Sequence, residues 1–523
     1  MPKRKSILSL ERQCMENVAR NMESMWVKDY RIHQLAGSLI QKLLQSLREK
    51  KLLSSSMLGS LLLPEVTEVN LTDCPHLMNS DIAQVITKCC KNLTSLILCN
   101  CNQLLPGTLA ELLKGLPHLI KLDLSKTQCD AHVLSVAGTC LRKLCQLDIS
   151  NCPGLFSQSL FHLAYNPISR SFGGQALETI VLGPLKSRIA LINLIQDLAF
   201  LLIALPKLKF LVHGFLIEAV ISIHEGQFER IWKPSRFPSL EEVARHRMSS
   251  HPNEEWPRLT LALKEIHDVM DSSLPVVCAV CPHLSEITVM LGEGPDIDQH
   301  FSSACHITKL TLYCRKKRDM KDLLPVMERL RPQLESLSIN GFCFEDGSSF
   351  QALLNHCVNL RNLSINLRTP CGKQPNIEGP GWDSDLLPRE FPRISNITLV
   401  LYDIWNPMPS SHIIFLEQCL ESLLKHSPCL EDLELAYLPF SLDEVFQKVL
   451  DPPGAALLAL RKLSLIEVQM SIGTIHQLLS SENQLEHISM NSVSSISEPN
   501  CQELLQRVYE EGLDLNILWT LKS

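Results

Sequence analysis

Five apolar side chains recur at helical spacing close to the start of the printed sequence. They are Leu10, Cys14, Val18, Met22 and Met25. Residues three or four apart share one face of an α-helix, and Ser9 in front of them is a good N-cap, so the segment predicts an amphipathic helix. Its apolar stripe can either dock into a groove of another protein or cover the open end of the chain's own fold.

Cysteine is the second residue type that could carry chemistry, because the chain has 20 of them. Cys278 and Cys281, in the sequence CAVC, have the spacing of half a zinc site, but a second pair of ligands at a suitable distance along the chain is missing. We therefore expect no bound metal. The segment MPKRKSILSLERQC lacks the apolar core of a secretory signal, so we expect reduced cysteines and a cytoplasmic or nuclear location.

Motifs for catalysis are missing from the sequence. There is no Walker loop, no Rossmann glycine fingerprint and no GxSxG elbow, and the sequence HEGQF at His224 lacks the second histidine of a zinc protease. We therefore expect a binding protein with no cofactor rather than an enzyme. The net charge of −7 also disfavours a nucleic-acid partner.

The most apolar stretch of the chain is LINLIQDLAFLLIALPKLKFLV. Gln196, Asp197, Pro206 and Lys207 interrupt it before it reaches the roughly 20 apolar residues of a membrane span. We therefore expect no transmembrane helix and no membrane partner.

One phrase recurs along most of the chain: an apolar residue, two polar residues, then apolar-x-apolar. The phrases begin at Val66, Leu93, Leu119, Leu144, Leu177, Leu208, Leu284, Ile307, Leu334, Leu360, Ile394, Leu430, Leu460 and Leu485. Where the units are regular, their starts are 23 to 27 residues apart, which is the period of leucine-rich repeats. The sequence therefore predicts an α/β solenoid, a horseshoe with parallel strands on the concave face and helices outside.

Cysteines occupy fixed places in these units. Cys74, Cys101 and Cys152 fall three residues after the last apolar strand residue, whereas Cys90, Cys281 and Cys357 fall three residues before the next phrase. A small apolar side chain suits such core positions. The pattern resembles the cysteine-containing subclass of leucine-rich repeats over residues 61–495, and that resemblance implies a substrate-recognition subunit of a ubiquitin ligase.

Two places interrupt the rhythm of the repeat. The phrases at Leu208 and Leu284 are 76 residues apart, which predicts a long insertion or degenerate units around residues 212–280. Residues 366–393 are rich in Pro and Gly and predict an extended loop. We expect residues 496–523 to form a C-terminal cap. The basic run at 315–318 should form a solvated loop, with a nuclear-import patch or a phosphate contact as the alternatives.

The helix at residues 9–18 resembles a known docking element. SLERQCMENV fits the pattern Ser/Thr-Leu-x-x-x-Cys-x-x-x-apolar of the BC box, by which receptors similar to the von Hippel-Lindau and SOCS-box proteins bind Elongin C. The resemblance implies that Leu10 fills an apolar pocket, Cys14 permits close helix approach and Val18 extends the contact. The remaining alternative for this helix is a plain cap of the solenoid.

Residues 1–60 are expected to form one helical docking region. Leu35, Leu39, Leu43 and Leu47 stand at i+4 spacing, where BC-box proteins carry a cullin box and F-box proteins carry the leucines that bind Skp1. Both patterns have a proline near their start, and Ala36-Gly37 stands there instead. The cullin, and the choice between Elongin C and Skp1, stay open.

The resemblance as a whole implies a substrate-recognition adaptor of a cullin-RING E3 ubiquitin ligase, docked to Elongin B/C by the N-terminal helix. The alternatives are an F-box-type adaptor that docks Skp1, or a scaffold outside the ligase system, similar to ribonuclease inhibitor. In each case the substrate or binding partner is a protein held by the repeats.

The concave face should carry the substrate site, because strand side chains alternate and those flanking the second strand leucine point away from the helices. The residues at these positions in the middle repeats are Thr288, Met290, Thr311, Tyr313, Ser338, Asn340, Ser364 and Asn366. Met290 and Tyr313 are the expected apolar anchors, and Trp382 in the following loop is a third candidate.

Overall fold

The computed structural model describes residues 10–25, 35–185, 191–227, 236–248, 259–294, 297–304, 306–344, 347–356, 359–369, 391–401, 408–451 and 456–520. The chain forms two compact units. The N-terminal unit comprises Leu8–Ile266 and Val276–Leu284, and the C-terminal unit includes His267–Pro275 and Ser285–Ser523.

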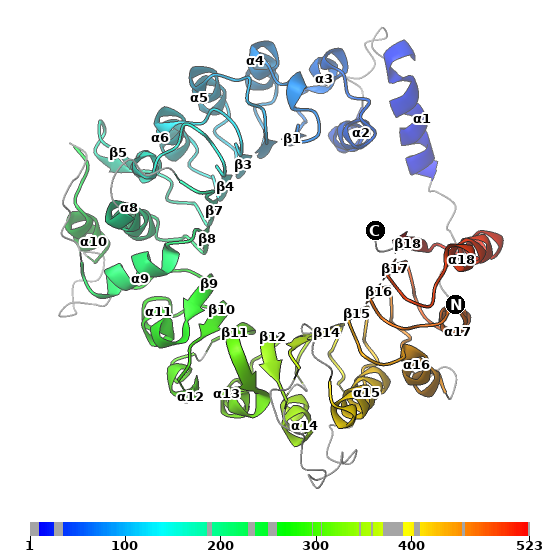
Figure 1. Cartoon of the computed structure of the whole chain (residues 1–523). Coiled ribbons are helices and arrows are strands. Elements are labelled where there is room, and N and C mark those ends of the chain that lie inside the picture. Colours follow the sequence, from blue (N-terminus) through cyan, green and yellow to red (C-terminus); the bar gives the residue numbers. More distant parts are fainter. Residues whose placement is uncertain are drawn as a thin grey trace. The chain divides into compact units, whose positions relative to one another are not determined.

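The N-terminal unit carries a parallel sheet with the strand order β1-β2-β3-β4-β7-β8 (Figure 1). These strands are β1 (Glu68–Asn70), β2 (Ser95–Ile97), β3 (Lys121–Asp123), β4 (Gln146–Asp148), β7 (Thr179–Val181) and β8 (Phe210–Val212). The helices are α1 (Leu10–Met25), α2 (Gly37–Glu49), α3 (Ser55–Leu61), α4 (Ser80–Cys89), α5 (Pro106–Lys114), α6 (Ala131–Cys140), α7 (Phe161–Ala164), α8 (Leu191–Ala204), α9 (Leu216–His224) and α10 (Leu240–Met248). A short antiparallel hairpin, β5 (Tyr165–Asn166) with β6 (Ser171–Phe172), interrupts the repeat.

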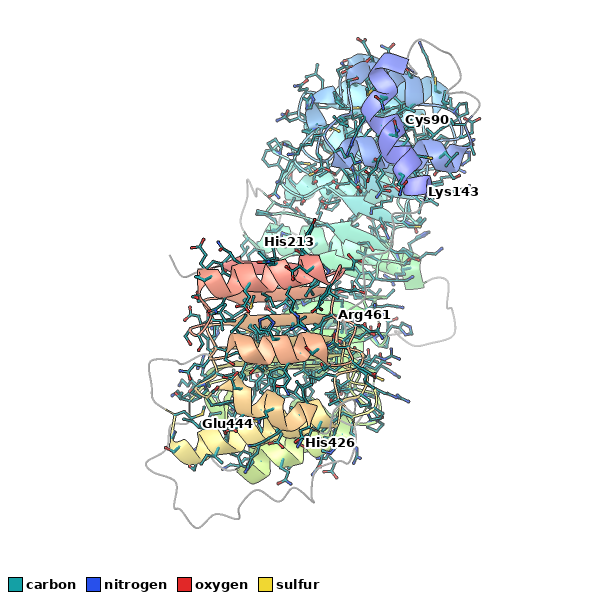
Figure 2. The ribbon with its side chains drawn as sticks, turned by 90° about the vertical axis from the view of Figure 1, so that its right-hand side faces the viewer. Cys90, Lys143, His213, His426, Glu444 and Arg461 are labelled. Atoms are coloured by element: carbon teal, nitrogen blue, oxygen red, sulfur yellow. The ribbon has the colours of Figure 1, made fainter. Side chains whose placement is uncertain are left out.

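The C-terminal unit is built on the longer parallel sheet, whose strands follow the chain order from β9 to β18. They are β9 (Glu265–Met270), β10 (Glu286–Leu291), β11 (Lys309–Asp319), β12 (Ser336–Cys343), β13 (Asn362–Leu367), β14 (Asn396–Leu401), β15 (Asp432–Ala436), β16 (Lys462–Ile466), β17 (His487–Asn491) and β18 (Asn516–Thr520). The helices are α12 (Ile297–His300), α13 (Leu324–Leu330), α14 (Gly347–Asn355), α15 (Ser410–Lys425), α16 (Leu442–Leu450), α17 (Ile472–Ser480) and α18 (Glu498–Glu510). The residues of α11 (Leu274–Val280) are divided between the two units. Figure 2 shows α16, α17 and α18 stacked side by side on the outside of the sheet.

Parallel register puts the same position of each phrase beside its equivalent in the next unit. Leu96 pairs with Leu122, and Leu122 with Leu147, and all three side chains are buried. Their neighbours in the strands alternate outward, as in the burial pattern of β10, β13 and β14. The predicted α/β leucine-rich repeat solenoid, with parallel strands on one face and helices on the other, is confirmed.

A left-handed residue ends many of the strand phrases. It stands two positions after the last apolar residue of the phrase and has a φ between 47° and 85°. It occurs at Asn100, Lys126, Asn151, Gly341, Tyr437, Glu467 and Ser492. Because this conformation costs a side chain with a Cβ about 1–2 kcal/mol, the burial that follows each turn must offset the strain.

The repeat cysteines are core residues. Cys74, Cys101 and Cys152 are buried, and the Cys152 thiol donates to the carbonyl oxygen of Leu124 in the preceding repeat at 3.0 Å. Thr127 takes the cysteine's place in its own repeat, where its hydroxyl donates to the same carbonyl at 2.7 Å. Cys90 (Figure 2) and Cys281 are also buried, whereas Cys357 lies outside the described residues. Every cysteine in the described part of the chain is a free thiol.

The interruptions contain more secondary structure than loops would. Within residues 212–280 the chain forms α9, α10 and the additional repeat strand β9, so degenerate units fill much of the expected insertion. The basic run at 315–318 belongs to β11 and is not a loop. Residues 370–390 of the expected loop lie outside the described residues. The expected cap at 496–523 adds α18 and β18, and β18 pairs in parallel with β17.

The apolar stretch around α8 belongs to the core of the N-terminal unit. Its residues from Leu198 to Leu205 are buried. Among the described residues, none of the helices combines the length and the apolar character needed to cross a membrane.

Gly341 tests the strain in these turns. It has φ +85°, and a Cβ at this position would overlap the carbonyl oxygen of Cys314. We expect Gly341→Ala to lower the free energy of unfolding by at least about 2 kcal/mol, measured by urea denaturation. The control is Gly473→Ala in α17, where a Cβ meets only Ser471 Oγ at 3.7 Å. Equal unfolding free energies for the two variants would contradict this account of the turn.

Thiol reactivity separates the core cysteines from the surface. Burial is the main cause that raises the pKa of Cys90, Cys101 and Cys281 to about 12 from 9.0, so their thiolate fraction at neutral pH falls on the order of a thousandfold. Cys14 and Cys429 are exposed. We expect iodoacetamide at about pH 8 to alkylate the two exposed thiols first, measured site by site by mass spectrometry. If the three buried and the two exposed cysteines were alkylated at similar rates in the folded chain, the burial of the three core thiols would be wrong.

Candidate functional site

The predicted docking helix is α1, which packs against α2. Ala19 is buried in this contact, and Glu16 forms an ion pair with Lys50 at 3.5 Å. Cys14 is exposed and Val18 is half-buried. Leu10 lies on the same helix, but its side chain is outside the described residues. The packing of α1 therefore leaves the Cys14 position accessible.

In contrast to α1, α2 is committed to the chain's own core. Leu43 and Leu47 of the predicted leucine stripe are buried, together with Ile40 and Leu44. Gly37 is the first residue of α2 and stands near the position where the resemblance implies a proline. A Cβ at Gly37 would lie 2.8 Å from the Cβ of Glu65. Close approach of α2 to the residues before β1 therefore explains a glycine at this position.

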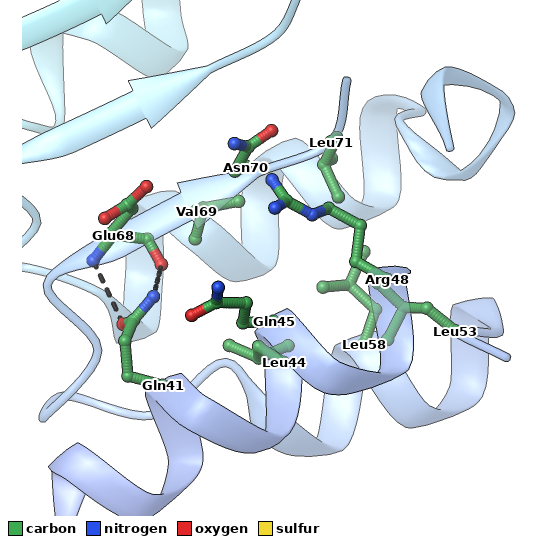
Figure 3. A pocket seen from close by; sticks show the side chains of 10 residues that line it. All are labelled: Gln41, Leu44, Gln45, Arg48, Leu53, Leu58, Glu68, Val69, Asn70 and Leu71. Carbon is green, nitrogen blue, oxygen red and sulfur yellow. Dashed lines mark hydrogen bonds between the residues drawn. The ribbon is translucent and has the colours of Figure 1, made fainter. Parts of the chain in front are cut away.

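The side of α2 that faces β1 closes the sheet with a side-chain amide (Figure 3). The Gln41 amide donates to the carbonyl oxygen of Glu68 at 2.8 Å and accepts from the Glu68 backbone N–H at 3.3 Å. Gln41 thus replaces a neighbouring strand at the edge, which would otherwise expose unpaired backbone groups. Beside it is a cavity of about 270 Å³, lined by Gln45, Arg48, Asn70 and by leucines of α2, α3 and the β1 segment.

The concave face of the C-terminal unit is the face of its sheet turned away from the helices. In register across β10 to β13 lie Thr288, Thr311, Ser338 and Ser364. A second row follows two residues later, with Met290, Tyr313, Asn340 and Asn366. The two predicted rows therefore lie side by side on the concave face of the sheet.

A hollow of about 400 Å³ opens on this face over β9, β10 and β11. Its lining residues are His267, Asp268, Thr288, Met290 and Tyr313. Tyr313 is 41% exposed and is the register neighbour of Met290. A ring nitrogen of His267, Nδ1, lies 3.0 Å from the Thr288 hydroxyl and ties β9 to β10. The structure thus brings three of the predicted substrate residues together around one concavity.

Further along the second row, Asn340 was predicted to be an exposed contact residue, but it is buried. It is 8% exposed, and its amide donates to the carbonyl oxygen of Leu312 at 3.3 Å. Asn366 in turn donates to the Asn340 side-chain oxygen. Asn340 is therefore part of a ladder that joins the strands, whereas Thr311 and Ser338 stay partly exposed. Trp382 lies outside the described residues.

The basic run on β11 has structural partners. Arg318 donates to the carbonyl oxygens of Gly292 at 3.1 Å and Gly294 at 2.6 Å. Lys316 forms an ion pair with Glu293, and the carbonyl oxygen of Arg315 accepts from Arg368 at 2.9 Å. These bonds join β11 to the segments that follow β10 and β13.

His267 and Asp268 are the lining residues that sequence reasoning missed. Their strand departs from the repeat phrase: after Leu263 and Ile266 the next buried residue is Val269, one position late. The extra residue is Asp268, which has φ 59°. The signal available in the sequence was the near-match LKEIHDV, with one inserted residue.

The residues around these sites do not assemble a metal centre. Among the described residues, no group of three or more His, Cys, Asp or Glu side chains is placed to hold an ion. At the CAVC pair, Cys281 is buried and Cys278 is half-buried. Burial raises the pKa of the Cys281 thiol to about 12, which disfavours the thiolate that zinc requires.

Comparison with known proteins gives distant structural matches only. The sequence matches no protein-family model and no curated protein. Among solved structures, an internalin of Listeria monocytogenes is 12% identical with a TM-score of 0.34, over 77% of this chain and 90% of that one. A chain of the Rad7 and Elc1 complex of yeast is 14% identical with a TM-score of 0.30, over 94% of this chain and 96% of that one. The leucine-rich repeat-containing protein LegL7 of Legionella pneumophila is 12% identical with a TM-score of 0.32, over 71% of this chain and 90% of that one. At these low scores, an argument about partners must come from the chain's own residues.

Proposed function

We propose that this protein is a substrate-recognition adaptor of a cullin-RING ubiquitin ligase. In this proposal α1 docks Elongin C of the Elongin B/C complex, and the concave face of the C-terminal unit holds the protein substrate. The observation that carries the proposal is the exposure of Cys14 on a helix whose sequence fits the BC box.

The packing of α1 supports docking in preference to a plain cap. A helix that only covered the solenoid would turn its apolar stripe inward, whereas α1 buries Ala19 and leaves Cys14 exposed and Val18 partly exposed. Ala19 lies roughly 140° around the helix from Cys14, given 100° per residue. One side of α1 thus contacts α2 while another is accessible to a partner.

The F-box alternative is weaker on physical grounds. Binding Skp1 through the spaced leucines of α2 would require Leu43 and Leu47 to leave the core, and both are at most 2% exposed. Withdrawing a buried leucine costs about 1.5–3 kcal/mol, before the loss of packing around it is counted. The described contacts of α2 therefore favour Elongin C over Skp1 as the partner, and they leave the cullin unassigned.

The concave face supports the substrate half of the proposal. Thr311, Ser338 and Ser364 are small and polar, so a partner's backbone can approach the sheet closely over these strands. Met290 and Tyr313 stand beside them as apolar and aromatic contacts, and large anchors of this kind carry much of the energy at protein interfaces. The two functions use different units, so each can be tested without the other.

Docking is tested with the double variant Leu10→Ala, Cys14→Ala. Loss of apolar contact should weaken Elongin B/C binding by about 2–5 kcal/mol, measured by isothermal titration calorimetry. The matched control is Arg20→Ala, an exposed position on another side of α1, which should bind as the parent does. Unchanged affinity in the double variant, or binding of Skp1 in place of Elongin B/C, would refute the assignment of α1.

The substrate face is tested by Tyr313→Ala, with deletion of residues 370–388 as a second variant. Quantitative mass spectrometry of copurified proteins should show severalfold loss of the same proteins in both variants, because an interface anchor of this kind is worth about 2 kcal/mol or more. Elongin B/C should copurify at the parental level. Asn491→Ala, on the same sheet face at β17, is the control. Full retention of every protein would move the binding surface elsewhere.

A further inference from the structure

We infer that the hollow over β9 to β11 is a pocket for a basic side chain, an arginine or lysine of the partner protein. The inference rests on the proposed function where it assigns that side chain to a ligase substrate. The binding chemistry itself follows from the five residues that line the hollow: a carboxylate at one side, an aromatic and a thioether wall, and two polar groups already engaged with each other.

The carboxylate is Asp268. It is exposed at the extra residue of β9, and among the described residues it has neither an ion-pair partner nor a hydrogen-bond partner. It is the only carboxylate among the lining residues. A guanidinium or ammonium group is the natural complement, because it satisfies an unpaired carboxylate with charge-assisted hydrogen bonds.

The walls suit the rest of a basic side chain. Met290 and Tyr313 lie side by side in register, and both contribute to the lining. Arginine and lysine carry long aliphatic stems that pack on apolar surface, and a cation over the face of a tyrosine ring gains a further attraction. The volume of about 400 Å³ leaves room for such a side chain to enter with part of its backbone.

Two lysines of β11 are held by carboxylates. Lys309 pairs with Glu286 at 2.9 Å, and Lys316 pairs with Glu293. Arg315 lies two residues beyond Tyr313, outside the lining set and exposed to solvent, where salt screens its charge. His267 is bonded to Thr288 at 3.0 Å. The lining therefore favours a cation over an acidic or a purely apolar group.

The experiment uses the full chain with ¹³C-methyl methionine and follows the Met290 resonance, assigned with Met290→Leu. The probe is N-acetyl-arginine amide, and N-acetyl-citrulline amide is its neutral isostere. We expect a saturable shift with the arginine probe and binding at least about tenfold weaker with citrulline, because only the first carries the charge that Asp268 can pair.

Asp268→Asn is the decisive variant, since asparagine tolerates the left-handed backbone at this position and keeps the shape of the side chain. It should abolish the preference for arginine over citrulline. Glu434→Gln is the matched control, because Glu434 stands on the same face in the register column of Ser364 and Thr398, away from the hollow. It should leave the preference unchanged.

Three results would overturn the inference: no saturable Met290 shift up to the solubility of the arginine probe, equal binding of citrulline, or an undiminished preference in Asp268→Asn. These outcomes are separate from a failure of the proposed function. If the parent chain bound the arginine probe but did not bind Elongin B/C, the adaptor proposal would be wrong. The hollow would then be a site for a basic side chain in a binding protein of another kind.

Discussion

The whole structure depends on one constraint: a single repeat cannot bury its own apolar residues. Leu96 is fully buried because Leu122 lies beside it in register, and Leu122 is covered by Leu147 in the same way. Strand pairing, helix packing and the turn residues all serve this stacking. Because only one side of each strand is needed for it, the other side is free to vary in sequence. Exposed residues on that side can therefore change with little cost to the core.

A stack of this kind must also end, and the ends are where the repeat needs other devices. At β1 the device is the Gln41 side chain, which satisfies both edge groups of Glu68, with the leucines of α2 and α3 beneath it. Once α2 covers this edge, α1 is not required for the same task. Cys14 on α1 is exposed, and the docking proposal starts from that exposure.

The sequence predicted what the stacking constraint controls. The strand phrases, the helix α1 and the burial of Cys74 or Cys101 follow from spacing and residue type alone. It failed where local geometry decides the outcome. The basic run extends β11, where Arg318 pairs in register with Phe342 of β12 and bonds to the carbonyl oxygens of Gly292 and Gly294, partners that no sequence pattern reveals. Asn340 is buried and bonds to the carbonyl oxygen of Leu312 and the amide of Asn366.

The candidate pocket arises where the repeat is least regular. One inserted residue in β9 disturbs the alternation, so Asp268 adopts a left-handed backbone and its carboxylate joins the lining of the hollow. A regular phrase would place a buried apolar side chain at this step, as Val289 does in β10. Insertions of this kind often redirect a side chain at a functional site, and they interrupt the local pattern from which a strand is predicted. The irregularity that supplies Asp268 to the pocket is therefore also what concealed it in the sequence.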